Sequence, residues 1–407
     1  MKKSLSIDDS HPKKKFTDPR NADTLKNIDA RYCVSCHVEH KPEITKAMGL
    51  TQPENVCYFC HKDVGENRPT HKELEFTTCG NSGCHNFHDN KALYEDFLVR
   101  HMDAPTHLPK QTLEIRDLLT ASYMNPDYPK DDYPLAALTS EQADAPAEHA
   151  DNEAIHNDWL TTKHAKAGVN CTACHEQTDA ATKVKTWVEK PEHTACQTCH
   201  ADESTSFQEG KHGMRLKAGL SPMTPAMARL PMNPDNKHKE LTCVSCHTAH
   251  TFDTQKAARE SCQTCHVDDH SVNFDNSPHA ALWQAELDGV KPKGTGVSCS
   301  SCHMPRVWHE DELGNERILV DHNQNNTLRP NDKMLRPVCL NCHGLGFAMD
   351  ALADPDLIRN NFSGQPNVHV ESIDMAREVD RIFREKKAAR KAAREAAEMN
   401  KNKTENE

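Results

Sequence analysis

The pattern that most constrains this chain contains every one of its cysteines. The 407-residue sequence has 18 cysteines, which form nine pairs, and each pair is followed directly by a histidine. Eight pairs have the spacing CxxCH and one has the longer spacing CxxxxCH. Numbered as motifs 1 to 9 in chain order, they are Cys33-Cys36-His37, Cys57-Cys60-His61, Cys79-Cys84-His85, Cys171-Cys174-His175, Cys196-Cys199-His200, Cys243-Cys246-His247, Cys262-Cys265-His266, Cys299-Cys302-His303 and Cys339-Cys342-His343.

This spacing is typical of covalent haem attachment. The two thiols form thioethers with the vinyl groups on one edge of a porphyrin, and the next residue places its imidazole under the iron as the proximal ligand. A zinc site instead needs two CxxC units that converge on one ion, and it has no use for a histidine directly after the second cysteine. With 27 histidines in 407 residues, nine such coincidences have a chance probability on the order of 10⁻¹¹. The sequence therefore predicts nine haem c cofactors and neither zinc nor a disulfide framework.

A second ligand for each iron has to come from outside the motifs. Of the 27 histidines, nine belong to the motifs and 18 remain, twice the number that nine bis-histidine haems would need. Four of these follow their own motif at helical spacing, on the same side as their own proximal histidine, so each is expected to ligate a neighbouring haem. These four are His40, His88, His250 and His270.

Other histidines precede or follow the motifs at longer distances and are further candidate distal ligands. For any one of them a surface position is the alternative. They are His71, His107, His164, His193, His212, His279, His309 and His322. By contrast, His11, His149 and His369 lie in polar or terminal stretches and are not expected to be ligands.

The composition indicates that haem forms much of the interior. Only 36% of the residues are hydrophobic and 5% are aromatic, which is little for a chain of this length to bury cores of its own. Each porphyrin brings a large apolar surface that replaces missing side chains. The expected fold is mainly α, with short helices and irregular loops packed around nine covalent haems and little or no sheet. It should form only with haem bound.

The motifs fall into a group of three and a group of six, separated by an acidic stretch rich in Pro and Ala. Near the end of the chain, Ile373, Ala376, Val379, Ile382 and Phe383 form one apolar helical stripe that can dock on the body. The basic helix beyond it is either a solvated tail or a positively charged binding surface for an acidic partner such as another cytochrome. The predicted organisation is a polar N-terminal segment (1–30), a three-haem module (31–102), a helical segment with the acidic linker (103–158), a six-haem module (159–370) and a C-terminal basic helix (371–407).

Charge and hydropathy narrow the location and the partners. The net charge of −12 disfavours nucleic acid, whose binding needs a basic face. No stretch approaches the roughly 18 apolar residues of a membrane span, so the chain is expected to be peripheral to a membrane at most. The first residues lack an apolar signal core, although haem c is normally attached outside the cytoplasm. We therefore expect a periplasmic or otherwise extracytoplasmic protein whose start was trimmed or misassigned.

Residues 155–345 resemble the hydroxylamine oxidoreductase group of octahaem cytochromes. The resemblance lies in His164-Ala165 before motif 4, GKHGMRL at 210–216, CVSCHTAH at 243–250, CQTCHVDDH with the following SPH at 262–279, and CSSCHMPR at 299–306. The three-haem N-terminal part looks more like a small generic cytochrome module added to it. In the oxidoreductases of this group, an Asp-His pair after a haem motif serves proton transfer beside an open haem. The resemblance implies that role for Asp269 and His270.

One residue that this group needs for oxidation has no counterpart here. The oxidase uses a downstream tyrosine that cross-links to the catalytic haem, and all six tyrosines of this chain lie upstream of the six-haem group. Hydroxylamine oxidation by that route is not expected, whereas a reductase of nitrite, hydroxylamine or a sulfur oxyanion remains open. Arg215, in a segment that could form a distal pocket, could stabilise such an anion. The alternative for this segment is a loop that packs over a bis-histidine haem.

The sequence thus leaves three functions to compare. The first is a carrier that passes electrons between extracytoplasmic partners, such as a membrane quinol dehydrogenase and other cytochromes, along mostly bis-histidine haems. The second is a multihaem reductase with one open haem, in which Asp269, His270 and Arg215 are the catalytic candidates. The third is haem-based sensing or electron storage. The surplus of histidines favours the first, because it leaves no iron obviously without a ligand.

Overall fold

The computed structural model describes residues 19, 22–27, 61, 63–67, 95–108, 131, 136–150, 152–310, 316–328 and 331–404. The chain divides into two compact units. The first unit comprises Met1–Pro109, Arg329–Ile358 and Gly364–Glu407, and the second comprises Lys110–Leu328 and Arg359–Ser363. Motifs 4 to 8 belong to the second unit and motif 9 to the first. The cysteines of motifs 1 to 3, with His37, His85, His40, His71 and His88, lie outside the described residues.

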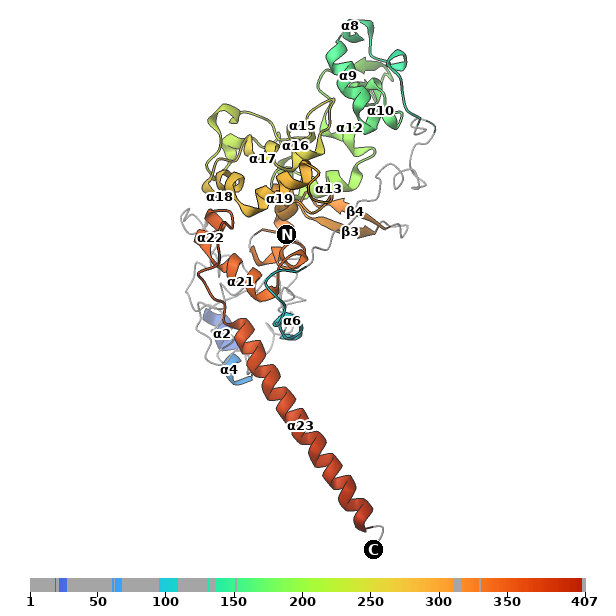
Figure 1. Ribbon diagram of the computed structural model, residues 1–407. Coiled ribbons are helices and arrows are strands. Elements are labelled where there is room, and N and C mark those ends of the chain that lie inside the picture. Colours follow the sequence, from blue (N-terminus) through green and yellow to red (C-terminus); the bar gives the residue numbers. More distant parts are fainter. Residues whose placement is uncertain are drawn as a thin grey trace. The chain divides into compact units, whose positions relative to one another are not determined.

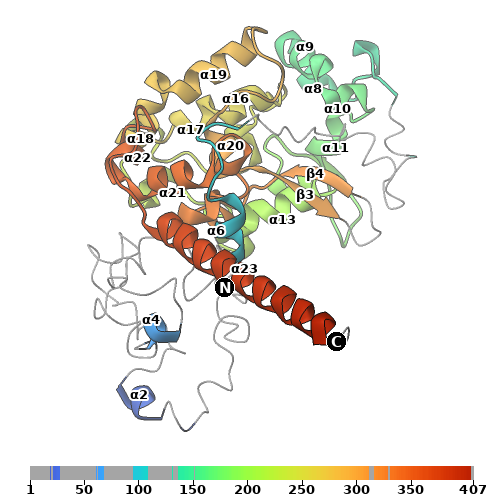
Figure 2. The ribbon, with the colours of Figure 1, turned by 60° about the horizontal axis from the view of Figure 1, so that its bottom comes forward.

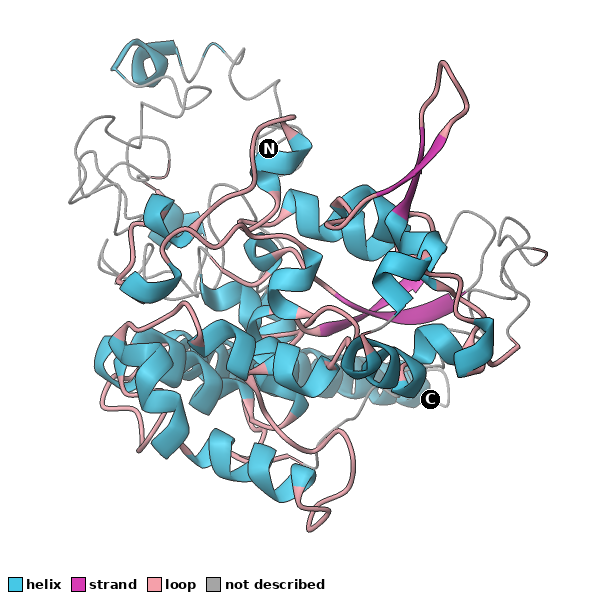
Figure 3. Cartoon of the chain, turned by 90° about the horizontal axis from the view of Figure 1, so that it is seen from above, coloured by secondary structure: helices cyan, strands magenta, loops and turns pink. Residues whose placement is uncertain are grey.

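The mainly α prediction is confirmed, as Figure 3 shows by the predominance of helices over strands. In the first unit the helices are α2 (Ala22–Asn27), α4 (Val64–Asn67), α6 (Glu95–His101), α21 (Leu345–Ala353), α22 (Pro355–Arg359, whose last residue belongs to the second unit) and α23 (Ser372–Thr404). Short 3₁₀ turns lie at Asn331–Met334 and Cys339–Asn341. The long α23 is drawn in red in Figure 1.

The second unit consists of short helices joined by loops and 3₁₀ turns. They are α8 (Ala147–Ala150), α9 (Glu153–Thr161), α10 (Lys163–Lys166), α11 (Cys171–His175), α12 (His193–Gln197), α13 (Ala201–Glu209), α14 (Met214–Lys217), α15 (Cys243–Cys246), α16 (Thr254–Ala258), α17 (Glu260–Gln263), α18 (Asp269–Asn273), α19 (Pro278–Leu287) and α20 (Cys299–His303). The 3₁₀ turns are Ser140–Gln142, Pro225–Met227, Pro234–Asn236, Phe274–Asn276 and Gln324–Asn326.

Most motif cysteines of the second unit lie in one turn of helix, and polar residues cap three of these turns. The Asn170 side chain accepts a hydrogen bond from the Cys171 backbone at the start of α11. Thr242 and Ser298 form capping boxes at the starts of α15 and α20. Such caps satisfy backbone donors that a helix start leaves unpaired. The residue before the first cysteine therefore helps to place the two sulfur atoms and the histidine of these motifs on one turn.

The strands of the described residues form two antiparallel hairpins in the second unit. Strand β1 (Glu176–Thr178) pairs with β2 (Lys185–Trp187), with Glu176 opposite Trp187. Strand β3 (Arg306–Glu310) pairs with β4 (Glu316–Val320), with Arg306 opposite Val320. Each hairpin begins within three residues of a motif histidine, so each continues directly from a predicted haem-binding turn.

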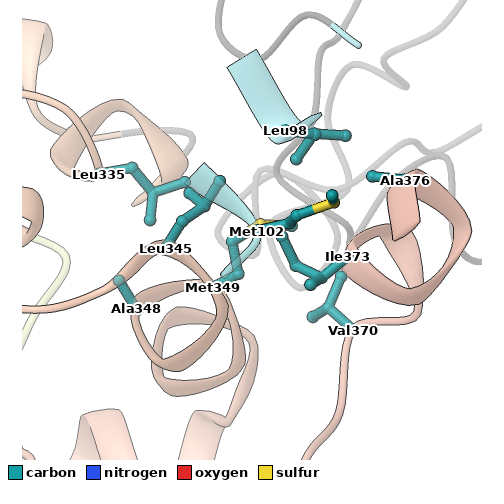
Figure 4. Close-up of a cluster of buried hydrophobic side chains, with 9 residues drawn as sticks. All are labelled: Leu98, Met102, Leu335, Leu345, Ala348, Met349, Val370, Ile373 and Ala376. Carbon is teal, nitrogen blue, oxygen red and sulfur yellow. The ribbon is translucent and has the colours of Figure 1, made fainter. Parts of the chain in front are cut away.

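A cluster of buried apolar side chains joins α6, α21 and α23 in the first unit (Figure 4). Figure 2 shows α6 beside the N-terminal part of α23. Arg377 of α23 donates a hydrogen bond to the Met102 carbonyl and pairs with Asp103. The cluster consists of Leu98, Met102, Leu335, Leu345, Ala348, Met349, Val370, Ile373 and Ala376.

The predicted apolar stripe of the C-terminal helix docks only at its start. Ile373 and Ala376 are buried, at 3% and 2% exposure, whereas Phe383 is 61% exposed. From Arg384 to Ala397 every residue is exposed. The basic part of α23 therefore stands free of the core cluster that holds its first turns.

Candidate functional site

Each of the six proximal histidines of motifs 4 to 9 lies against one histidine from outside the motifs. The ring centroids are 5.9 Å apart for His175 and His250, 6.1 Å for His200 and His164, 6.3 Å for His247 and His322, 6.2 Å for His266 and His212, 6.1 Å for His303 and His270, and 5.2 Å for His343 and His107. Two imidazoles that bind one iron from opposite faces, through metal–nitrogen bonds of about 2 Å, have centroids about 6 Å apart. These separations are close to what a bis-histidine haem needs, and that of His343 and His107 is the shortest at 5.2 Å.

The pairs join different motifs. His164 precedes motif 4 but faces the proximal histidine of motif 5. His250 follows motif 6 at helical spacing and faces the proximal histidine of motif 4. His270, which follows motif 7, faces His303 of motif 8 with its ring perpendicular, at 90°. In none of these three cases does a histidine face the proximal histidine of its nearest motif in the sequence.

Burial favours the neutral, metal-binding form of some of these imidazoles. Desolvation lowers the pKa of His164, His212, His247 and His303 to about 4 in each case. Neighbouring imidazoles lower the same pKa values further, because two positive charges in one buried place repel. One ring nitrogen of His164, Nδ1, is buried without a hydrogen-bond partner among the described residues. A neutral, desolvated imidazole of this kind suits an axial ligand.

Local structure places several of the non-motif histidines. The side chain of Thr162 caps α10 by accepting a hydrogen bond from Ala165, which fixes His164 in the first turn. His250 has a left-handed backbone, with φ of 66°. At motif 9 the backbone of Leu108 donates to the Cys342 carbonyl over 2.8 Å, and Gly344 donates to the Thr106 carbonyl.

Gly344 directly follows the motif 9 histidine and is needed for a close approach. A Cβ at this position would collide with the backbone carbonyl of Pro105. Only a glycine lets the segment that carries His107 run along the end of motif 9. The side-by-side placement of His107 and His343 therefore depends on this residue.

The cysteines of successive motifs in the second unit lie close together. The twelve cysteines of the described residues form no disulfides with one another, as thioether formation requires. The thiol of Cys243 is hydrogen-bonded to Cys196, which joins motifs 5 and 6, and that of Cys262 to Cys299, which joins motifs 7 and 8. Weaker electrostatic interactions join Cys174 of motif 4 to motif 5, and Cys246 of motif 6 to motif 7. Motifs 4 to 8 are thus linked one after another.

The predicted catalytic residues do not gather in one place. The guanidinium of Arg215 donates to the backbone and the hydroxyl of Ser221, six residues further along. Asp269 is exposed in the first turn of α18, and His270 faces His303. The segment after His212 bonds to motif 7, because the Asn233 backbone donates to the Cys265 carbonyl. These contacts favour a loop over a bis-histidine haem at this segment.

Two predicted distal ligands of the second unit, His309 and His279, have other side chains as neighbours. His309 lies 3.3 Å from the Asp202 carboxylate, and the His279 ring is 6.0 Å from that of Phe362. His193 begins α12. His309 is thus a partner for an acidic side chain, and it provides a reference for variants of the paired histidines.

One contact at motif 4 was not foreseen from the sequence. The ring of Trp187 stacks on the proximal His175, with centroids 4.7 Å apart and planes at 11°. His149, which was not expected to be a ligand, also stacks on the indole, at a centroid distance of 4.9 Å. The Nδ1 atom of His175 is 2.8 Å from the Val188 carbonyl, which orients the ring. The sequence hinted at this contact only through the tryptophan shortly after motif 4. It could not place the indole on His175, because the stack requires the β1–β2 hairpin.

Two curated proteins are similar to parts of the chain. The "Multiheme cytochrome MtrA" of Shewanella baltica (strain OS185) is 24% identical over 177 residues, which cover 38% of this chain and 49% of that protein. The chain is a distant homologue of multihaem c-type cytochromes. The "High-molecular-weight cytochrome c" of Nitratidesulfovibrio vulgaris (strain Hildenborough) is also 24% identical, over 227 residues that cover 46% of this chain and 40% of that protein. This multihaem chain therefore spans at most about half the length of these relatives. It matches no known family profile.

Both relatives are cytochromes by name, which supports a multihaem c-type cytochrome at the level of the broad class. The finer resemblance of residues 155–345 to the hydroxylamine oxidoreductase group stays a prediction, as do the domain boundaries drawn from the sequence. Among the described residues, no helix combines the length and the hydropathy that crossing a membrane would require.

Proposed function

We propose that this chain is a nonahaem cytochrome that carries electrons between extracytoplasmic redox partners along mostly bis-histidine haems. The observation that supports this most is the set of six histidine pairs, each with one proximal member and a separation suited to one iron. A six-coordinate haem has no position left for substrate, so it exchanges electrons and does no other chemistry.

The interactions between the cysteines of successive motifs indicate a route for the electrons. Thioethers attach the porphyrin at one edge, so motifs whose cysteines lie close together hold porphyrin edges close together. In the second unit hydrogen bonds between cysteines join motif 5 to motif 6 and motif 7 to motif 8, and electrostatic interactions join motif 4 to motif 5 and motif 6 to motif 7. We infer an electron path through these five haems in that order. Other cytochromes or a membrane quinol dehydrogenase are the proposed partners, and the periplasm is the proposed location.

The haem content and the coordination can be tested separately. Intact mass of the purified protein should correspond to the chain plus nine haems. The ferric protein should show only low-spin, six-coordinate haem by electron paramagnetic resonance. A high-spin ferric signal that nitrite or cyanide abolishes would instead support a reductase with an open haem.

The ligand pairs can be tested by a matched pair of variants. His322→Ala should convert one haem of the nine to the high-spin form, because His322 faces His247. His309→Ala should leave the spectrum unchanged, because His309 faces Asp202. If both variants keep every haem low-spin, His322 is not a ligand and the pairing at motif 6 is wrong.

A further inference from the structure

Residues 359–363 form a short loop that belongs to the second unit, although the chain on both sides of it belongs to the first. This loop, called the clamp loop here, bonds to α18 at two points. The Asn273 side chain donates to the Arg359 carbonyl over 3.1 Å. The Asn361 side chain donates to the His270 carbonyl over 2.8 Å. The loop therefore holds both the start and the end of the helix that carries His270.

The clamp loop also contacts the imidazole of His270. Nδ2 of Asn361 lies 3.5 Å from Nε2 of His270. The Phe362 ring meets the imidazole edge to face, with centroids 6.2 Å apart and planes at 88°. On another side Phe362 approaches His279. The orientation of His270 toward the motif 8 histidine, 6.1 Å away, is thus set by side chains of the clamp loop as well as by α18.

The backbone of the clamp loop is unusual where it touches His270. Asn361 and Phe362 are consecutive residues with φ of 53° and 57°. Asparagine tolerates this left-handed region, but a bulky residue such as phenylalanine rarely adopts it. Such conformations persist where the surroundings impose them, and they occur often at ligand clamps. Asn361 is also only 6% exposed, and its amide holds the backbone of His270 through the hydrogen bond to the carbonyl.

We propose that Asn361 is a positioning residue that keeps His270 on the iron of motif 8, and that loosening the clamp loop opens the sixth coordination position of that haem. The inference rests on the proposed function, since it takes His270 as the distal ligand of motif 8. It identifies motif 8 as the place where this chain can admit a small exogenous ligand such as cyanide. The other five pairs of motifs 4 to 9 do not involve this loop.

The test uses the full haem-loaded chain and spectroscopic readouts. His270→Ala is the reference and should convert one haem completely to the high-spin form. Asn361→Gly removes the amide but leaves the left-handed backbone accessible. It should give a partial high-spin signal that amounts to less than one haem, and cyanide binding to that haem should increase about five- to tenfold, the effect of losing one net hydrogen bond on an opening equilibrium.

Asn360→Ala is the matched control, because the Asn360 side chain bonds only within the clamp loop, to the Ser363 backbone at 3.2 Å. It should keep all haems low-spin. If His270→Ala leaves every haem low-spin, the ligand assignment itself is wrong at motif 8. If His270→Ala opens one haem while Asn361→Gly behaves like the unmodified protein, the clamp is refuted and the proposed function stands. An equal effect of Asn360→Ala would assign the change to general loosening of the loop and overturn the role of Asn361.

Discussion

In the first unit, buried Leu, Met, Val, Ile and Ala side chains form one cluster between α6, α21 and α23. The second unit buries many small or polar residues. Its paired histidines are half-buried, and their ring separation would fit one iron with its two axial bonds. Its buried residues include Ala165, Ala167, Ala257, Ala280, Thr162, Ser204, Ser261, Ser277 and Ser298. The difference suggests that side chains stabilise the first unit to a large extent, whereas the second depends on its haems.

Removal of haem from the second unit should have the largest effect. Replacing the cysteines of motifs 4 to 8 by serine prevents attachment there and leaves motif 9 intact. Without the porphyrin faces, the helices of the second unit have too little apolar surface to bury. Hydrogen exchange should show nearly complete loss of amide protection in α11 to α20, with α21 and the start of α23 still protected. Full protection of α11 to α20 would show that side chains alone hold this unit.

A cavity in the core cluster should be the next largest effect, and it should act on the first unit. Leu345 is 0% exposed, so Leu345→Ala should cost about 2–5 kcal/mol of unfolding free energy. Phe383→Ala is the control, because the exposed ring of Phe383 should contribute at most about 0.5 kcal/mol. Denaturant unfolding followed by the exchange of α21 amides measures both. Equal costs for the two variants would contradict the position of the core.

Loss of a helix cap in the second unit should have a smaller effect. The Asp253 carboxylate accepts hydrogen bonds from the Gln255 and Lys256 backbones at the start of α16. Asp253→Ala should therefore cost about 1 kcal/mol, whereas Asp253→Asn should cost less because it can still cap. Thermal unfolding of the haem-loaded protein measures this. On the proposal that haem stabilises this unit, a cost above that of Leu345→Ala would contradict the comparison of the two units.

The smallest effect concerns pH. Hydrogen bonds to Asp374 and Asp350 raise the pKa of His369 in the first unit. A raised pKa means that the stabilisation is fully present below the unfolded pKa of about 6.5 and is lost as the pH rises through the folded pKa. The change should be below about 1 kcal/mol, because the pairs are exposed. Unfolding of the first unit between about pH 6 and pH 8 should show it, and His369→Gln should abolish it.

The sequence was sufficient for features that depend on local pattern. It predicted the mainly α fold, because helical composition and the one-turn motifs are local. It also predicted the docking of Ile373 and Ala376, which are three residues apart on one helical face. The exposure of Phe383 was not foreseen, since a stripe does not reveal where its partner surface ends.

The sequence could not decide which histidine faces which motif. His212, His270 and His309 look alike in the sequence, yet two face proximal histidines and one faces Asp202. That distinction depends on how distant turns pack, and spacing along the chain carries no such information. The same holds for Asn361 and Phe362, which meet His270 only after the chain returns from the first unit.

The crossed histidine pairs have a consequence for assembly. On the proposed ligation each iron closes a loop of chain, as a disulfide does, and lowers the entropy of the unfolded state. These loops overlap along the chain. The loop from His175 to His250 begins inside the loop from His164 to His200. The loop from His212 to His266 begins inside the loop from His175 to His250. Each closure shortens the free chain left for the next. Binding of the second histidine should therefore become easier from one iron to the next, and the last iron to gain its second histidine should complete the fold of the unit.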